Sequence, residues 1–198
     1  MRMAFPDIGP NVARKEKPRM MRWARWALTR LGWRIEGTVP DLKKFVVIGA
    51  YHTSNWDFFV AMAVMFALDM EGSWIAKHTI FRWPFGPILR ACGGNPVNRQ
   101  QHHGMVQGVI ELFREREKFI FAITPEGTRS QVEHWKTGFY HIARGAQVVI
   151  VPAYFDYPSR TVGFGPPLEP SGDVEGDIAA LQRFYEPYKK TAARPDRA

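Results

Sequence analysis

The stretch FVVIGAYHTSNWDFF, residues 45–59, joins two apolar segments through a short polar turn. Residues 45–50 have the composition of a buried strand, and the eleven residues 58–68 carry no charge. Eleven residues are too few to cross a bilayer, so a core helix is predicted over residues 57–70. Because a turn from a buried strand into a helix is a common place for chemistry, its polar residues are candidate functional residues.

His52 and Asp57 are the candidate catalytic pair in this turn. They would lie well apart around one continuous helix, so contact requires His52 in the turn and Asp57 in the first helical turn. A neutral imidazole accepts a proton near pH 7, and a carboxylate on its other nitrogen orients it and stabilises the imidazolium that forms. Ser54 and Asp57 also have the spacing of a helix-capping box, so capping is the alternative interpretation of Asp57.

Length, charge and cysteine content limit the class of protein. The chain has 198 residues, a formal net charge of +8 and a single cysteine, Cys92. This length suits one domain with a full-sized core. One cysteine excludes an intrachain disulfide, and the six histidines show no zinc-ligand spacing with it, so we expect no metal site and a reducing compartment.

The N-terminal part is strongly basic: residues 1–40 contain nine Lys or Arg and three Asp or Glu. We predict a loose basic leader over residues 1–19 and an amphipathic helix over residues 20–33, too short and too charged to span a bilayer. Tryptophan beside arginine is typical of a helix at a membrane interface, where each basic residue near anionic lipid contributes about 1 kcal/mol. Packing on the protein's own core is the alternative. We therefore divide the chain into residues 1–35, leader and interfacial helix, and residues 36–198.

Residues 92–99 form a loop that ends in Arg99. Its glycines let the backbone approach a ligand, although Gly-Gly-Asn-Pro on its own is a turn signal. The loop lacks the Gly-Lys-Ser/Thr ending of a nucleoside-triphosphate site. Arg99 is thus a candidate anion-binding residue.

A second loop follows the predicted buried strand at residues 119–123 and has the sequence TPEGTRS. Gly127 permits close approach of a ligand, Thr128 offers a hydroxyl, and the planar guanidinium of Arg129 suits two phosphate oxygens. The alternative is an ordinary surface turn in which Glu126 pairs with Arg129.

Apolar periodicity predicts the remaining elements. Further strands are expected at residues 73–77, 147–151 and 160–164, and further helices at residues 88–91, 102–117, 137–144 and 173–190. Because strands alternate with helices, we predict a single α/β domain with a mostly parallel or mixed sheet covered by helices. The loops after the strands would then share one face and bring His52, Arg99, Glu126 and Arg129 together.

Four blocks in this order resemble the 1-acylglycerol-3-phosphate acyltransferase family of the glycerolipid acyltransferases. They are His52-x4-Asp57, Gly94 to Arg99, Pro125 to Arg129, and Val151-Pro152, spread over about residues 45–155. Two positions differ from the family pattern, since Tyr51 stands where Asn is frequent and Asn98 where Asp is usual. These differences concern the acceptor more than the reaction.

The resemblance implies transfer of an acyl group from acyl-CoA or acyl carrier protein to a lipid hydroxyl, in phospholipid biosynthesis. His52 would be the general base and Asp57 would hold it. The residues implied to bind the acceptor's phosphate are Arg99, Glu126, Gly127, Thr128 and Arg129. No metal or bound cofactor is implied, and the expected partners are membrane lipids and the thioester donor, on the cytoplasmic face of the cell membrane.

Several alternatives stay open. The acceptor can instead be another lipid hydroxyl, such as that of a lyso-ornithine lipid, and the oligomeric state is not fixed by the sequence. A pI near 9.8 and seven tryptophans also fit a non-catalytic membrane binder or a nucleic-acid binder. Nucleic acid is not expected as a partner, because the excess charge lies mostly in the leader and no base-stacking motif is found.

Overall fold

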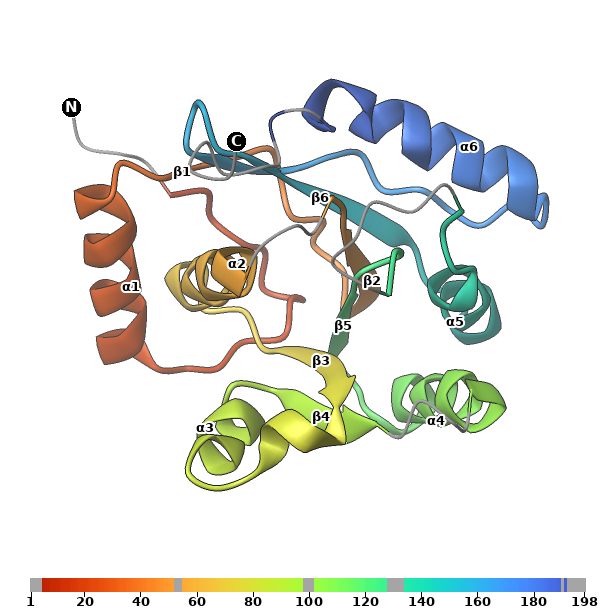
Figure 1. Cartoon of the computed structure of the whole chain (residues 1–198), viewed down its shortest axis with the longest axis horizontal. Helices are drawn as coiled ribbons and strands as arrows, with labels where there is room; N and C mark the ends of the chain where they lie inside the picture. Colours follow the sequence, from red (N-terminus) through yellow and green to blue (C-terminus); the bar gives the residue numbers. More distant parts are fainter. Residues whose placement is uncertain (1–4, 52–54, 98–101, 128–133, 190, 192–198) are drawn as a thin grey trace.

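A seven-stranded mixed sheet with helices on both faces forms the molecule, and the predicted α/β architecture is confirmed (Figure 1). The computed structural model describes residues 5–51, 55–97, 102–127, 134–189 and 191. The strands are β1 (Arg34–Glu36), β2 (Lys44–Gly49), β3 (Gly72–Lys77), β4 (Gly94–Val97), β5 (Phe119–Ile123), β6 (Ile150–Asp156) and β7 (Thr161–Phe164). The helices are α1 (Pro18–Arg30), α2 (Asn55–Ala67), α3 (Phe85–Ala91), α4 (His102–Glu115), α5 (Gly138–Ala146) and α6 (Val174–Tyr185), with the 3₁₀ turns η1 (His78–Phe81) and η2 (Glu186–Tyr188).

The strand order is β1-β7-β6-β2-β5-β3-β4. All neighbouring strands pair in parallel except β6 and β7, which are antiparallel. In β2, Ile48 is paired with Ile123 of β5 on one side and with Pro152 of β6 on the other. The carboxyl ends of five adjacent strands, β6 to β4, therefore lie along one edge of the sheet.

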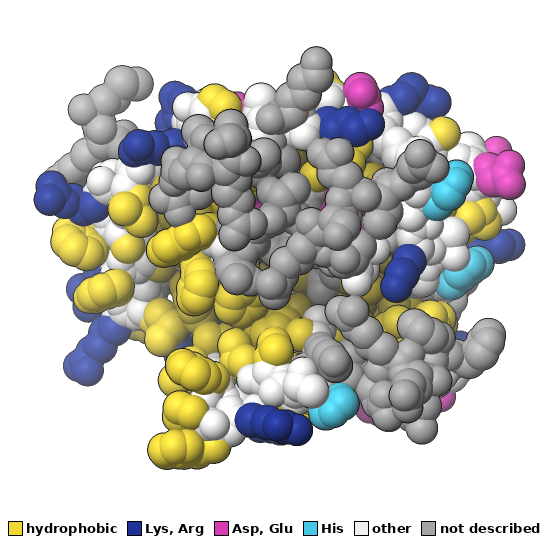
Figure 2. Space-filling model, in the orientation of Figure 1, with side chains coloured by type: hydrophobic (Ala, Val, Ile, Leu, Met, Phe, Trp, Pro, Cys, Tyr) yellow, Lys and Arg dark blue, Asp and Glu magenta, His cyan; other side chains and the backbone are white. Residues whose placement is uncertain are grey.

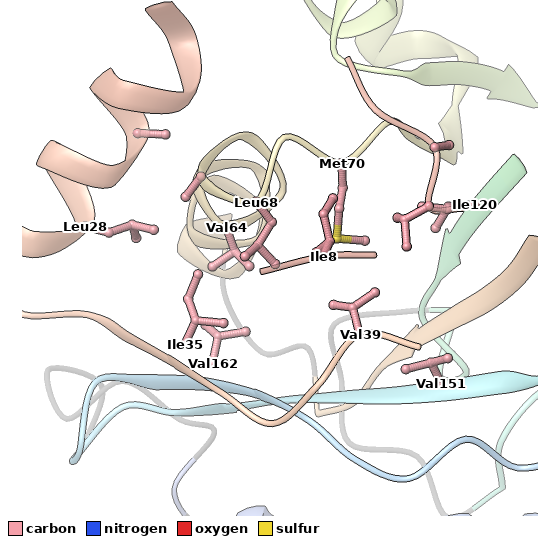
Figure 3. Packing of buried hydrophobic residues seen from close by; sticks show 14 of the residues in the cluster. Ile8, Leu28, Ile35, Val39, Val64, Leu68, Met70, Ile120, Val151 and Val162 are labelled. Carbon is pink, nitrogen blue, oxygen red and sulfur yellow. The ribbon is translucent and has the colours of Figure 1, made fainter. Parts of the chain in front are cut away.

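β2 is buried on both faces because helices cover the sheet from both sides. Phe45 belongs to the core that α1 and α2 cover, whereas Val46 and Ile48 belong to the core beneath α4, α5 and α6. Figure 3 shows the first of these cores, where side chains of α1, α2 and the strands meet. Burial on both faces explains why this strand has an uninterrupted apolar run and not an alternating pattern.

The structure differs from the prediction in several elements. β1 and β4 were not expected, and both are short strands whose pairing with distant segments stabilises them. β6 continues through Pro152, which precedes the first residue paired with β7 and whose carbonyl accepts a hydrogen bond from Gly165 N–H (2.8 Å). α5 continues past Gly145 and ends with Gln147 in the left-handed conformation.

The basic leader is not loose over its described part. Ile8, Val12 and Ala13 are buried in the core beneath α1 and α2. Lys15 N–H donates to Asp69 O (3.1 Å), and Glu71 N–H donates to Ala13 O (2.8 Å). Residues on both sides of the proposed boundary at residue 35 thus contribute to one core, and the division into two parts stays a prediction.

α1 packs on the core of the protein, which was the alternative to a membrane-interface helix. Ala24 and Leu28 are buried against α2, and Arg25 Nε donates to the carbonyl of Ala67 at the end of that helix (2.8 Å). The aromatic rings of Trp23 and Trp26 are exposed and lie 5.5 Å apart. The helix is therefore docked on the core by one side and presents tryptophans on another.

Leu28 and Leu31 provide a matched test of this docking. Leu28 is 1% exposed and lies on the side of α1 that faces Val64 and Leu68, whereas Leu31, one turn away, is 60% exposed (Figure 3). We expect Leu28→Ala to lower the free energy of unfolding by about 2–5 kcal/mol, because it leaves a cavity between α1 and α2. Leu31→Ala should change it by less than about 0.5 kcal/mol. Urea unfolding measures both, and equal small effects would contradict the docking of α1.

Candidate functional site

The candidate site lies at the edge of the sheet where parallel strands end. β2 precedes the segment with His52, β4 precedes the segment with Arg99, and β5 precedes the segment with Glu126 and Arg129. His52, Arg99, Thr128 and Arg129 themselves lie outside the described residues. The structure describes Asp57, Glu126 and Gly127 and shows that the strands leading to all the candidate residues end at the same edge.

Asp57 stands in the first turn of α2 and its side chain has no exposed surface. Its Oδ1 accepts a hydrogen bond from the phenol of Tyr157, which is 100 residues away in the sequence and directly follows β6. A buried carboxylate is costly unless hydrogen bonds replace those it made with water. A residue that only capped the helix would gain its hydrogen bond equally well at the surface, so this burial favours a role inside the site.

The aromatic residues that flank Asp57 face the other way. Trp56 is 54% exposed and Phe59 is 60% exposed, and their ring centroids lie 5.7 Å apart. One turn of α2 therefore carries a buried carboxylate on its inner side and an apolar surface on its outer side.

Gly127 lies in a tight loop after β5. Its φ is +62°, a conformation that glycine adopts at little cost. A Cβ at this position would lie 2.9 Å from Lys136 Cδ and 3.0 Å from Lys136 Nζ, so the lysine side chain packs closely against the loop. Lys136 N–H in turn donates to Pro125 O (2.8 Å), which fixes the lysine beside the loop. Lys136 is a cation at the site that the sequence analysis did not identify.

Glu126 is 2% exposed, although it precedes Gly127 in the same loop. A carboxylate repels a phosphate, so its burial fits support of the loop better than direct contact with an anionic substrate. Its negative charge reaches the tyrosines below the site: burial first, then the charges of Glu186 and Glu126, raise the pKa of Tyr51.

Tyr185 joins the two strands beneath the site. Its phenol lies 2.7 Å from Ile48 O in β2 and 2.9 Å from Ala153 O in β6. Burial raises the pKa of Tyr185 well above its usual range, so the group is a neutral hydroxyl at physiological pH. The rings of Tyr51 and Trp135 meet Tyr185 edge-on at 6.3 and 5.6 Å. This aromatic cluster gives the loops a rigid base.

Tyr157, Tyr185 and Lys136 were missed because each acts on residues far away in the chain. The sequence offered a weak signal only for Lys136, a basic residue seven positions after Arg129. In the part of the chain that the structure describes, no three His, Cys, Asp or Glu side chains are grouped as a metal site would require.

Comparisons with known proteins identify a family and a similar fold. A family model described as Acyltransferase matches residues 19–156. The fold is similar to that of the crystal structure of the 1-acyl-sn-glycerophosphate (LPA) acyltransferase, PlsC, from Thermotoga maritima, with a TM-score of 0.63 and 19% sequence identity. That similarity covers 89% of this chain and 80% of the Thermotoga maritima chain. No curated protein matches the sequence at a significant level.

Proposed function

The chain belongs to the acyltransferase family, and we propose that it moves a fatty acyl group from an acyl thioester, acyl-CoA or acyl carrier protein, to the hydroxyl of a lysophospholipid-type acceptor. The observation that carries this proposal is the buried Asp57 carboxylate in the first turn of α2, five residues after His52. A carboxylate can orient a histidine base and stabilise its imidazolium, and the carboxyl edge of a parallel sheet is where the substrates of α/β enzymes bind.

In the proposed reaction His52 takes the proton of the acceptor hydroxyl, and the hydroxyl oxygen attacks the carbonyl carbon of the thioester. The tetrahedral intermediate then expels the thiolate, which takes the proton from the imidazolium of His52. The products are the acylated acceptor and a free thiol. A positioned general base contributes about 10²–10⁴-fold, and the remainder comes from holding the two substrates together and stabilising the oxyanion. No metal or cofactor takes part in the proposed steps.

We propose 1-acylglycerol-3-phosphate as the first acceptor to test, because the Thermotoga maritima protein is named for this activity. Arg99 and Arg129 would bind the phosphate, with Gly127 and Thr128 allowing its approach. The ammonium of Lys136, placed against Gly127, adds a third positive charge. Glu126 would hold the loop rather than the phosphate.

We further propose that the protein binds the inner face of the cell membrane. No helix within the described ranges is long and apolar enough to cross a bilayer. Large exposed apolar residues nevertheless lie on or directly beside α1, α2, η1 and α3: Met20, Trp23, Trp26, Leu31, Trp56, Phe59, Ile80, Trp83, Phe85 and Ile88. Figure 2 shows hydrophobic side chains over α1, α2 and α3 on one face, with basic side chains at its edge. Exposed apolar side chains with basic side chains beside them suit an anionic lipid surface. We call the surface formed by these ten apolar residues the apolar face.

Catalysis is tested by thiol release from acyl-CoA in the presence of a lysolipid. Wild-type protein should release thiol only when an acceptor is supplied. His52→Ala should lower kcat by at least about 10²-fold because it removes the general base. Asp57→Asn should have nearly the same effect because it removes the carboxylate partner of that base. Asp57→Asn with normal kcat and a lower free energy of unfolding would show that Asp57 is only a helix cap. Vesicle binding without thiol release for any acceptor would identify a non-catalytic membrane protein.

The acceptor is tested with Arg129→Lys and Lys136→Gln. An ammonium cannot reproduce the two-point grip of a guanidinium on phosphate, so Arg129→Lys should raise the KM for 1-acylglycerol-3-phosphate about tenfold or more. Lys136→Gln removes one charge and should raise it less. The KM for acyl-CoA is the internal control. If the wild type, Arg129→Lys and Lys136→Gln all use a lyso-ornithine lipid as well as 1-acylglycerol-3-phosphate, the acceptor is not recognised through a phosphate.

Membrane binding is tested by sedimentation with anionic vesicles. Deleting residues 1–33 is unsuitable because it removes Val12, Leu28 and Trp33 from the core. The double variant Trp23→Gln/Trp26→Gln changes only exposed rings, so it should lower the vesicle-bound fraction about tenfold while leaving the melting temperature unchanged. Binding of the wild type should weaken as salt is added. Undiminished, salt-independent sedimentation of the variant would exclude α1 from the membrane contact.

A further inference from the structure

Tyr157 connects the turn between β6 and β7 to the buried carboxylate of α2. Its phenol donates a hydrogen bond to Asp57 Oδ1, and the two residues are separated by 100 positions in the sequence. β6 lies next to β2 in the sheet, with Gly49 paired to Ala153, so the segments that follow both strands leave from one edge. The parallel pairing of β2 and β6 therefore brings the segments that carry Asp57 and Tyr157 to the same edge.

The position of Tyr157 is fixed by further contacts. Arg160 N–H donates to Tyr157 O (3.1 Å), which closes the turn between β6 and β7. The buried ring of Trp33 meets the Tyr157 ring edge-on, with centroids 5.3 Å apart at 82°. Trp33 is itself held after α1 by its N–H bond to Leu28 O (2.9 Å). A phenol held in this way can fix the direction of the group that accepts its hydrogen bond.

The physical effect on Asp57 follows from its burial. A carboxylate with no exposed surface cannot be reoriented by water, so its direction is set by its hydrogen-bond donors. A donor on Oδ1 limits rotation about the last side-chain bond. A carboxylate partner holds an imidazole base in one tautomer and one ring direction.

We propose that Tyr157 is a positioning residue that orients the Asp57 carboxylate toward the general base. The proposal rests on the proposed function, because it takes Asp57 to be the partner of His52. Tyr157 acts through Asp57 and need not contact either substrate. Its removal should therefore lower kcat and leave the KM values for donor and acceptor unchanged.

The test is a double-mutant cycle with Tyr157→Phe, Asp57→Ala and the double variant. Tyr157→Phe keeps the ring against Trp33 and removes only the hydroxyl. It should lower kcat about 10- to 100-fold, the effect expected for one hydrogen bond to a charged group. In the Asp57→Ala background the same substitution should cause no further loss, because nothing is left to orient. Tyr154→Phe is the matched control, since Tyr154 lies in β6 and its ring stacks on Tyr188 at 3.7 Å; its kcat should remain normal.

The outcomes separate this proposal from the proposed function. Normal kcat for Tyr157→Phe beside an impaired Asp57→Ala would overturn the positioning role alone. An equal loss from Tyr157→Phe in both backgrounds would show a general structural effect and would also overturn it. Normal kcat for Asp57→Ala would overturn both the role of Asp57 as the partner of His52 and the role of Tyr157 as its positioning residue.

Urea unfolding of the wild type, the two single variants and the double variant gives a readout that does not depend on activity. This measurement can be made even if the wild type transfers no acyl group to any acceptor. Non-additive shifts of the unfolding midpoint would support the coupling of Tyr157 to Asp57. Additive shifts would overturn it.

Discussion

The parallel pairing of β2 with β5 and β6 is the constraint on which the rest of the molecule depends. Both faces of β2 are buried, so a slip of one residue would move Phe45 into the opposite core and bring Val46 in its place. The register is therefore strongly determined. Because it is determined, the strand ends that lead to Asp57, Glu126 and Tyr157 lie together although those residues are up to 100 positions apart.

The first turn of α2 then brings two environments close together. Successive residues of a helix point in directions about 100° apart, so Asp57 faces the interior while Trp56 and Phe59 face outward. In the proposed reaction the acceptor is a lipid and the base is a polar group that needs a defined, partly dry setting. A helix with this pattern meets both requirements within one turn, so an acceptor held at the apolar face would remain close to the site.

Much of the fold was predictable because its strongest signals are local. The apolar run that became β2, the helix that became α2 and the strand β5 follow from composition and periodicity alone. β4 was not predicted, because its sequence GNPV has the composition of a turn and only pairing with β3 makes it a strand. β1 is equally dependent on β7. Such strands exist through tertiary contacts, which a local pattern does not contain.

The candidate site divides in the same way. Asp57 was identified by its spacing from His52, and Gly127 by its loop after a strand. Tyr157 was not identified, because nothing near it in the sequence indicates a carboxylate partner 100 residues earlier. Local patterns thus found the groups that would perform the chemistry. The tertiary structure was needed to find the groups that hold them.

The N-terminal segment shows why burial has to be assigned residue by residue. Its positive charge and tryptophans predicted a separate interfacial helix, yet Val12, Leu28 and Trp33 are part of the core. A helix fixed by Leu28 cannot rotate to bury its whole apolar side in lipid, so only the side chains that the core leaves exposed are able to reach a bilayer. Trp23 and Trp26 are such side chains. If they bind the membrane, the docking of α1 on α2 fixes their direction relative to Asp57, so binding at the apolar face would also orient the candidate site toward its lipid acceptor.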